Sequence, residues 1–487
     1  MRLKTLGFAA LTATLAACGG GGGGSTPVAV TPTPVTCTAP AVLTNGVCVT
    51  PAPTVSVQLT KSKTAVGSPV TLSWTSTNAS SCVGMDALSG TKAINNSEVI
   101  TPSKGGQYTY TISCDGAGGT VKQSVPLVVP MQLYKSSYEN KMAAGNVLGP
   151  QILPVPVYNT PYAFADFLQN GTYTMVVSIL EYDLNKPISQ ASNGHIHFYQ
   201  HISGKWSDIT SILLSDNTGC IHPRKAMVAD LNGDGKPDVV FACHGYDNSP
   251  SLGLPPPGEQ QRVLLSQVDG TYKNVLLPIT AYAHGGSVAD VSGNGYADII
   301  YTDTSIRKEP FYLVNNQNGT FTENANRTPQ ATKKFTCFTA ATCEYSIYSM
   351  DFVDFNADGK YDLWIGGSIH PADSNGFNNS INAAIFYNTG NNIFTNVNPT
   401  KLPTSFTSGA SLDVIFIAGK VIMLNTLDYS GVSIDVVNIT DMTLTTPYTH
   451  TGGYANTTWM TWIPWINIFN GNIVASDAIF QLSVPLQ

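Results

Sequence analysis

The stretch Asp230-Leu-Asn232-Gly-Asp234-Gly235-Lys-Pro-Asp238 lies between two short apolar runs, residues 226–229 and 239–242. Side-chain oxygens fall at its positions 1, 3, 5 and 9, and glycine stands at position 6. A hard divalent cation takes about six to eight oxygen ligands, and a loop that wraps round it needs glycine where the backbone bends most sharply. The stretch therefore predicts a calcium-binding loop between two strands.

The same loop returns at residues 290–298 and 354–362, and the three starts lie 60 and 64 residues apart. Worn copies, which keep only part of the pattern, begin at Asp166, Asp413 and Asn467. The flanks are short, β-branched and aromatic, which favours strands over the helices that an EF-hand needs. An internal repeat of this length, built from short strands, is typical of β-propeller blades.

Two to three calcium ions are therefore expected. The loop at Asp290 is the weakest of the three, because it offers two carboxylates where the others offer three. The predicted metal-binding residues, at positions 1, 3, 5, 7 and 9, are Asp230, Asn232, Asp234, Lys236, Asp238, Asp290, Ser292, Asn294, Tyr296, Asp298, Asp354, Asn356, Asp358, Lys360 and Asp362.

The three complete loops resemble the FG-GAP/VCBS repeats of integrin α-subunit propellers and of many bacterial surface proteins. The nearby sequences His222-Pro-Arg-Lys, His244-Gly-Tyr-Asp and His284-Gly-Gly are similar to the bacterial lipoprotein branch of that family. The resemblance extends from about residue 166 to residue 367. It implies propeller blades with calcium in the hairpin that joins the first two strands of each blade.

At roughly 60 residues per blade, residues 131–487 form a six-bladed propeller, and seven blades remain open if the C-terminal half hides a further copy. The last unit, from Ile466 to Gln487, has room for only three strands. We expect the extended segment Met131–Tyr138 to supply its missing outer strand and so to close the ring.

The N-terminus indicates export. Arg2 and Lys4 precede an apolar run, residues 6–17, that is too short to span a bilayer and ends in Leu15-Ala-Ala-Cys18. This ending resembles a bacterial lipobox, which implies a signal peptide of residues 1–17 and a lipid anchor on Cys18 in the outer membrane. An ordinary secretory signal with a chance cysteine is the alternative.

Residues 18–54 are rich in Gly, Pro and Thr and form a tether.

Residues 55–130 alternate apolar and polar positions at period 2 and carry one Trp, Trp74, with the pair Cys82 and Cys114. They resemble a bacterial immunoglobulin-like sandwich that serves as a spacer. Cys82 follows the Trp strand instead of preceding it, so the usual disulfide geometry is not expected.

Eight of the nine cysteines fall into neighbouring pairs, and in an exported chain such pairs predict disulfides. Zinc is the competing interpretation, which the lack of CxxC spacing disfavours. The predicted pairs are Cys37–Cys48, Cys82–Cys114, Cys220–Cys243 and Cys337–Cys343.

The charge balance argues against nucleic acid, because 24 basic residues face 31 acidic ones. The sequence also lacks the motifs of nucleophilic, zinc-hydrolytic and phosphate-binding enzymes. These observations favour a protein that neither binds nucleic acid nor acts as an enzyme. We expect a monomer that is attached to the membrane through its lipid anchor.

Residues that precede first strands and follow second strands should gather on the face opposite the calcium hairpins. They are His222, Arg224, His244, His284 and His370. Such histidines bind metal, act as an acid–base pair, or simply hydrogen-bond to neighbouring loops. The preferred prediction is a surface-exposed, non-enzymatic lipoprotein that binds a glycan or a protein on this face. An extracellular polysaccharide-processing enzyme and a cell-envelope assembly scaffold are the alternatives.

Overall fold

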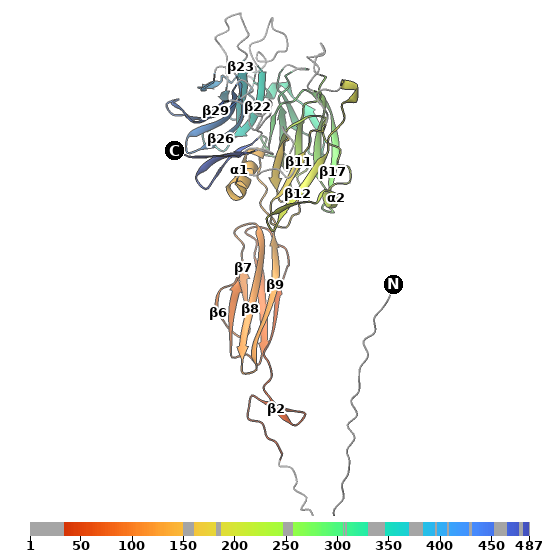
Figure 1. Cartoon of the computed structure of the whole chain (residues 1–487), viewed down its shortest axis with the longest axis vertical. Helices are drawn as coiled ribbons and strands as arrows, with labels where there is room; N and C mark the ends of the chain where they lie inside the picture. Colours follow the sequence, from red (N-terminus) through yellow and green to blue (C-terminus); the bar gives the residue numbers. More distant parts are fainter. Residues whose placement is uncertain are drawn as a thin grey trace, which may run out of the picture.

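The computed structural model describes residues 34–149, 160–181, 187–246, 257–304, 306, 309–329, 346–369, 383–394, 397–406, 409–427, 431–451, 465–476 and 481–486. The fold is all-β, and Figure 1 shows a narrow sandwich at the base of a larger body of radiating sheets. Within the described residues no helix has the length and hydropathy needed to cross a bilayer.

The sandwich contains two antiparallel sheets around one core. Alternation brings Leu72 and Trp74 inward, and the indole nitrogen of Trp74 donates a 2.9 Å hydrogen bond to the carbonyl of Ala93. Before the sandwich, the tether forms a small hairpin. The strands are β1 (Val42–Thr44) and β2 (Val47–Val49) in the hairpin, β3 (Thr54–Leu59), β4 (Val70–Thr77) and β7 (Asn96–Ile100) in one sheet, and β5 (Ser81–Asp86), β6 (Gly90–Lys92), β8 (Gly106–Gly116) and β9 (Gly119–Val129) in the other.

Both predicted disulfides of this N-terminal part are present. Cys37 joins Cys48 across the tether hairpin, and Cys82 joins Cys114. These last two residues are direct partners on the neighbouring strands β5 and β8. The bridge therefore lies within one sheet instead of between the two, as the position of Cys82 after the Trp strand led us to expect.

The larger body consists of antiparallel units whose strands pair in chain order. Units 4 and 5 join through a short pairing of β23 with β26. The described strands are β10 (Tyr162–Ala165), β11 (Thr174–Ser178), β12 (Ile196–Ile202) and β13 (Lys205–Asp208) in unit 1; β14 (Pro223–Ala229), β15 (Asp238–Cys243), β16 (Glu259–Ser266) and β17 (Tyr272–Ala281) in unit 2; β18 (Gly286–Ala289), β19 (Asp298–Tyr301), β20 (Phe311–Asn315) and β21 (Phe321–Glu323) in unit 3; β22 (Ser346–Val353), β23 (Asp362–Ile369), β24 (Ala383–Phe386) and β25 (Thr400–Leu402) in unit 4; β26 (Gly409–Ile417), β27 (Lys420–Leu427), β28 (Gly431–Asn438) and β29 (Leu444–Thr451) in unit 5; and β30 (Ile466–Phe469), β31 (Asn472–Ser476) and β32 (Gln481–Pro485) in unit 6.

The expected outer strand from Met131–Tyr138 is wrong. Residues 131–135 belong to no strand, and Ser136 instead caps helix α1 (Ser137–Leu148) by accepting a hydrogen bond from the amide of Glu139. The remaining helices are short: η1 (Ile188–Gln190), α2 (Thr210–Leu213) and η3 (Ala325–Arg327). Unit 6 therefore has three strands in the part of the chain that the structure describes.

Helix α1 lies at the centre of the body, where it contacts the first strands of units 1, 2, 3, 4 and 6. It also reaches unit 5, since the hydroxyl of Tyr138 accepts a 2.7 Å hydrogen bond from the amide of Phe416. Gly145 permits the close approach, because a Cβ at this position would lie 1.9 Å from the side chain of Asn467. The first strands thus surround one axis, which is the arrangement of a propeller, and α1 fills it.

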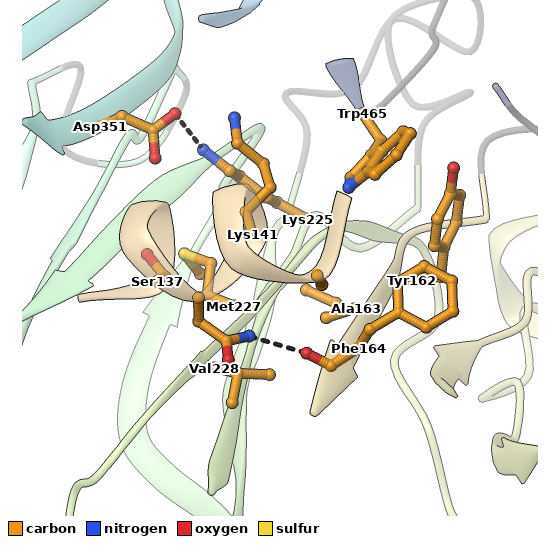
Figure 2. A pocket seen from close by; sticks show the side chains of 13 residues that line it. Ser137, Lys141, Tyr162, Ala163, Phe164, Lys225, Met227, Val228, Asp351 and Trp465 are labelled. Atoms are coloured by element: carbon orange, nitrogen blue, oxygen red, sulfur yellow. Dashed lines mark hydrogen bonds and ion pairs between the residues drawn. The ribbon is translucent and has the colours of Figure 1, made fainter. Parts of the chain in front are cut away.

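Helix α1 makes both apolar and polar contacts: Tyr138 and Ala144 pack in hydrophobic clusters of the body, and other residues form hydrogen bonds and an ion pair. The side-chain amide of Asn140 donates to the carbonyl of Phe164 at 2.7 Å, and Lys141 Nζ lies 2.7 Å from Asp413 Oδ1. A second buried ion pair joins Lys225 to Asp351 at 2.9 Å across units 2 and 4. Figure 2 shows Lys141 of the helix with Lys225 and Asp351 nearby.

A cavity of about 30 Å³ lies beside α1, with the rings of Tyr162 and Trp465 on its far side (Figure 2). Pockets that bind small molecules measure roughly 300–1,000 Å³, whereas a single water needs only about 10–15 Å³. The axial cavity is therefore too small for a ligand, and any binding function has to lie elsewhere.

The joint with the sandwich lies on the same side as the hairpins between first and second strands. In the first of these hairpins, Asp166 Oδ2 accepts a 2.9 Å hydrogen bond from the amide of Met131, directly after the sandwich. Gly171, with a φ of 81°, packs so tightly that a Cβ there would lie 2.6 Å from backbone atoms of Gly106 and Val129. This hairpin side of the body therefore faces the sandwich.

The buried pair Lys141–Asp413 gives a stability prediction. Asp413→Ala leaves a buried ammonium without its carboxylate, which costs about 3–5 kcal/mol. The double variant Lys141→Met/Asp413→Asn removes the charge and keeps an acceptor for the amide of Ile466, which now bonds Asp413 Oδ2. We expect it to regain most of the loss in urea unfolding followed by tryptophan fluorescence. Equal losses in the two variants would contradict a charge effect.

Candidate functional site

The first predicted calcium loop joins β14 to β15, the first two strands of its unit. Asp230 accepts hydrogen bonds from the amides of Gly233 (2.7 Å) and Gly235 (2.8 Å), and Asn232 Oδ1 accepts one from the amide of Asp234. Gly235 has a φ of 75°, a conformation that glycine adopts without strain. These bonds turn the side-chain oxygens towards the inside of the loop.

The other two complete loops share this frame. The position-1 carboxylates, Asp290 and Asp354, each accept a 2.9 Å hydrogen bond from the amide of the position-6 glycine. Both loops lie between the first two strands of their units, β18 and β19 or β22 and β23. The loop placement expected from the sequence is therefore the one observed.

The position-9 carboxylates have a structural role that the repeat pattern does not reveal. Asp238 is fully buried and accepts hydrogen bonds from the amides of Leu231 (2.7 Å) and Ser266 (2.6 Å). Asp362 likewise accepts from the amides of Phe355 and Asn388. Each carboxylate thus ties its loop to the end of the third strand.

The first and third loops each bring three carboxylates close together. Burial, together with the nearby charge of Asp230, raises the pKa of Asp238 to about 7, although its hydrogen bonds oppose this shift. Burial raises the pKa of Asp362 to about 6, and the charges of Asp358 and Asp354 act in the same direction. Three carboxylates close enough to repel one another are a donor set that suits a divalent cation, which would favour their ionised forms.

The second loop differs, because an arginine reaches into it. Arg327 Nη1 donates to Ser292 Oγ at 2.9 Å and lies 3.4 Å from Asp298 Oδ2. Asp298 also accepts hydrogen bonds from the hydroxyls of Ser292 and Tyr312. Arg327 ends the short helix η3, which follows the fourth strand of the same unit.

Two of the three worn copies, residues 413–419 and 467–471, end in the turns that join the first two strands of units 5 and 6. Their first residues, Asp413 and Asn467, lie within β26 and β30, and the turns follow at Ala418–Gly419 and Asn470–Gly471. Both polar side chains bond to Lys141 of the axial helix, Asp413 to its ammonium and Asn467 to its carbonyl. The hairpins are therefore where the repeat predicts them, while the leading polar residues bond to the axial helix.

The histidine face was predicted from strand ends, and the structure brings three of its members together. His222 precedes β14, His244 follows β15 and His284 precedes β18. His244 Nε2 lies 3.0 Å from His284 Nε2, and the rings of His222 and His244 are 5.1 Å apart. All three are buried, as is Arg224. His370 lies outside the described residues, as do Cys18, Cys337 and Cys343.

Burial keeps His244 neutral. It lowers the pKa of His244 well below its usual value, and the charges of His284 and Arg224 lower it further. His284 Nδ1 is 3.0 Å from the hydroxyl of Thr304. In the contact between the two rings, one Nε2 donates and the other accepts, so a proton lies between His244 and His284.

Glu259 was missed by the sequence analysis, because no motif connects it with the histidines. It accepts hydrogen bonds from the amides of Ile221, His222 and Gly245, and burial raises its pKa. The disulfide between Cys220 and Cys243 lies next to it, as predicted from their positions across two strands. Because both sulfurs are in the disulfide, this Cys–Cys–Glu group is not a zinc site.

Comparisons with known proteins find one repeat type in the sequence and several solved structures with low similarity. Residues 188–241, which include the first loop, match the FG-GAP-like repeat. No curated protein matches the chain. Similar solved structures include the periplasmic gluconolactonase of Pseudomonas aeruginosa (14% identity, 64% of this chain and 82% of that one, TM-score 0.36). The C-terminal domain of P. aeruginosa PilY1 (10%, 67% and 82%, 0.36) and a lectin of Aleuria aurantia (8%, 72% and 97%, 0.32) are also similar.

The two kinds of carboxylate in the first loop should respond differently to substitution. Asp238→Ala removes the acceptor of two buried amides, each worth about 1–3 kcal/mol when left unsatisfied, so it should lower the melting temperature in calcium and in chelator alike. Asp234→Ala acts mainly through the cation, so its effect should be largest in calcium. Thermal melts in both buffers test this, and an Asp238→Ala variant that melts normally in chelator would contradict it.

Proposed function

We propose that this protein is a lipid-anchored recognition protein of the outer-membrane surface, whose calcium-braced propeller presents its histidine face to a glycan or protein partner. One observation carries the proposal. The hairpin side of the propeller body meets the sandwich through Met131, Asp166 and Gly171, so the histidine face points away from the sandwich and the tether. A protein that binds partners at a cell surface needs its binding face to point away from its membrane anchor.

Calcium fits the first and third loops on chemical grounds. Their position-1 and position-9 carboxylates are preset by backbone hydrogen bonds, and mutual repulsion among three carboxylates favours a cation between them. Asp230, Asn232, Asp234 and Asp238 would hold one ion, and the matching residues from Asp354 to Asp362 the other. A bound ion stabilises the folded state by mass action.

The sandwich, the six units and the disulfide Cys220–Cys243 each have a role in this proposal. The sandwich of β3 to β9, immunoglobulin-like in its strand pattern, serves as a spacer between anchor and propeller. Six units around α1 form six blades. The disulfide Cys220–Cys243 and the hydrogen bonds of Glu259 fix the start of the segment that follows His244, which is what a binding surface built from loops requires.

A second candidate is supported by the buried histidine pair. A neutral His244 beside His284, with Arg224 nearby, is a set of groups that supports acid–base chemistry on an anionic sugar. This would make the protein an extracellular polysaccharide-processing enzyme. The recognition role is preferred because Glu259, the carboxylate beside His222, is already committed to three backbone amides.

The anchor is tested by fractionation. Cys18→Ser removes the residue that would carry lipid, so the variant should move from the outer-membrane fraction to the soluble fraction. Protease treatment of intact cells then separates surface display from a periplasmic orientation. Unchanged sedimentation of the Cys18→Ser variant with membranes would refute the anchor.

Binding and catalysis are separated with the soluble Cys18→Ser protein. It is screened against glycan and matrix-protein arrays, and then compared with a variant in which residues 247–256 are replaced by a short Gly-Ser linker. A recognition protein should lose its partner in this variant and keep it within a few-fold in His284→Ala. Val268→Ser is the matched control, since Val268 is fully exposed at the β16–β17 turn on the hairpin side.

If the protein is an enzyme, His284→Ala should abolish its activity. Turnover of an anionic polysaccharide by the parent protein, abolished by His284→Ala and unaffected by Val268→Ser, would replace the recognition role with catalysis.

A further inference from the structure

The second loop has its own positive charge. Arg327 Nη1 contacts the position-3 hydroxyl of Ser292 at 2.9 Å and the position-9 carboxylate of Asp298 at 3.4 Å. The guanidinium also lies over the ring of Tyr312, with its carbon 5.4 Å from the ring centre. The side chain of Asp298 is fully buried and that of Arg327 is 22% exposed, so the pair is well shielded from solvent.

The Oδ2 oxygen of Asp298 has no acceptor capacity left. Asp298 accepts four hydrogen bonds: Oδ1 takes the amide of Asn315, and Oδ2 takes the hydroxyls of Ser292 and Tyr312 and the guanidinium of Arg327. An ionised carboxylate offers about four acceptor sites. A calcium ion would therefore have to displace bonds that the protein already makes, and the donated hydroxyl of Ser292 faces the carboxylate instead of a cation.

The position-9 carboxylates of the first and third loops bond to neutral donors. Asp238 accepts hydrogen bonds from three backbone amides and from the side chain of Ser266, and Asp362 accepts two from backbone amides. The basic residues near these loops, Lys236 and Lys360, contact the position-5 carboxylates at the exposed side of the loop. Neither lysine bonds to the buried carboxylate at position 9 in the described contacts.

The formal charges agree with this difference. The first and third loops each carry three carboxylates, whereas the second carries two, with Asn294 at position 5. The guanidinium of Arg327 compensates one of the two. Affinity for calcium falls as the negative charge of the ligands falls. In the second loop this charge is lowered first by Asn294, which replaces a carboxylate, and again by the guanidinium of Arg327.

We propose that Arg327 is the internal counter-ion of the second loop, and that the chain binds two calcium ions, in the first and third loops only. This inference rests on the proposed calcium binding of those two loops. It narrows the expected two to three ions to two and leaves out the loop of Asp290, Ser292, Asn294, Tyr296 and Asp298.

A calcium-independent loop in this position braces the first one. The amide of Ala297 donates to the carbonyl of Asp230 at 2.9 Å, and the side chain of Asn315 donates to the carbonyl of Leu231 at 2.8 Å. The ring of Tyr296 packs over Gly233, where a Cβ would meet it at 2.6 Å. The second loop therefore holds the backbone of the first loop in place whether or not calcium is bound.

Ion counting by native mass spectrometry tests the proposal on the soluble Cys18→Ser protein in calcium. We expect two ions in the parent, one in Asp230→Asn, one in Asp354→Asn and two in Asp290→Asn. The double variant Arg327→Gln/Asn294→Asp removes the internal cation and restores the third carboxylate, so it should bind three. Asn294→Asp with Arg262→Gln is the matched control and should stay at two, because Arg262 bonds Asn274 and no loop carboxylate.

Three ions in the parent, or the loss of an ion in Asp290→Asn, would overturn the role of Arg327 while leaving calcium binding intact. A parent that binds no calcium would instead refute the proposed calcium sites and the two-ion count together. If the double variant does not fold, the Asp290→Asn count decides alone.

Discussion

The structure depends on a helix that fills the axis of the propeller with polar contacts. A ring of sheets leaves a channel where its first strands converge, and buried backbone and charged groups there need partners. Helix α1 supplies them, through Asn140 to unit 1, Tyr138 and Lys141 to unit 5, and its Lys141 carbonyl to Asn467 of unit 6. Only a short segment separates the sandwich from this helix. The same part of the chain therefore connects the sandwich to the body and fills the axis of the ring.

Carboxylates at or near the hairpins of the repeat are compensated in four different ways. Asp166 accepts three backbone amides, one of them from the segment that leaves the sandwich. Asp298 takes a guanidinium and two hydroxyls, and Asp413 takes the ammonium of the axial helix. The first and third loops keep three carboxylates each, and Lys236 and Lys360 contact the carboxylates at position 5. The carboxylates of the repeat thus differ from unit to unit in the groups that compensate them.

Sequence predicted the features that short-range chemistry determines. Loop spacing located the hairpins, period-2 alternation located the sandwich, and strand-end positions brought His222, His244 and His284 to one face. Three of the four disulfides were also predicted correctly, and the fourth lies outside the described residues. Helix α1 escaped because its buried residues include Ser137, Asn140 and Gly145, which form no apolar stripe. Arg327 escaped because its partners lie 29 and 35 residues earlier in the chain and no local pattern connects them.

The burial of the histidines constrains what their face can do. A binding surface for a sugar or a protein is built from exposed groups, whereas His222 and His244 are 1% and 0% exposed. They are therefore part of the support beneath the surface, together with Glu259 and the disulfide Cys220–Cys243. The histidine cluster therefore contributes packing and polar contacts at this end of the body, where His244 lies 3.0 Å from His284 and Glu259 bonds the amides of His222 and Gly245. A group that contacts a partner directly has to come from residues with greater exposure than these.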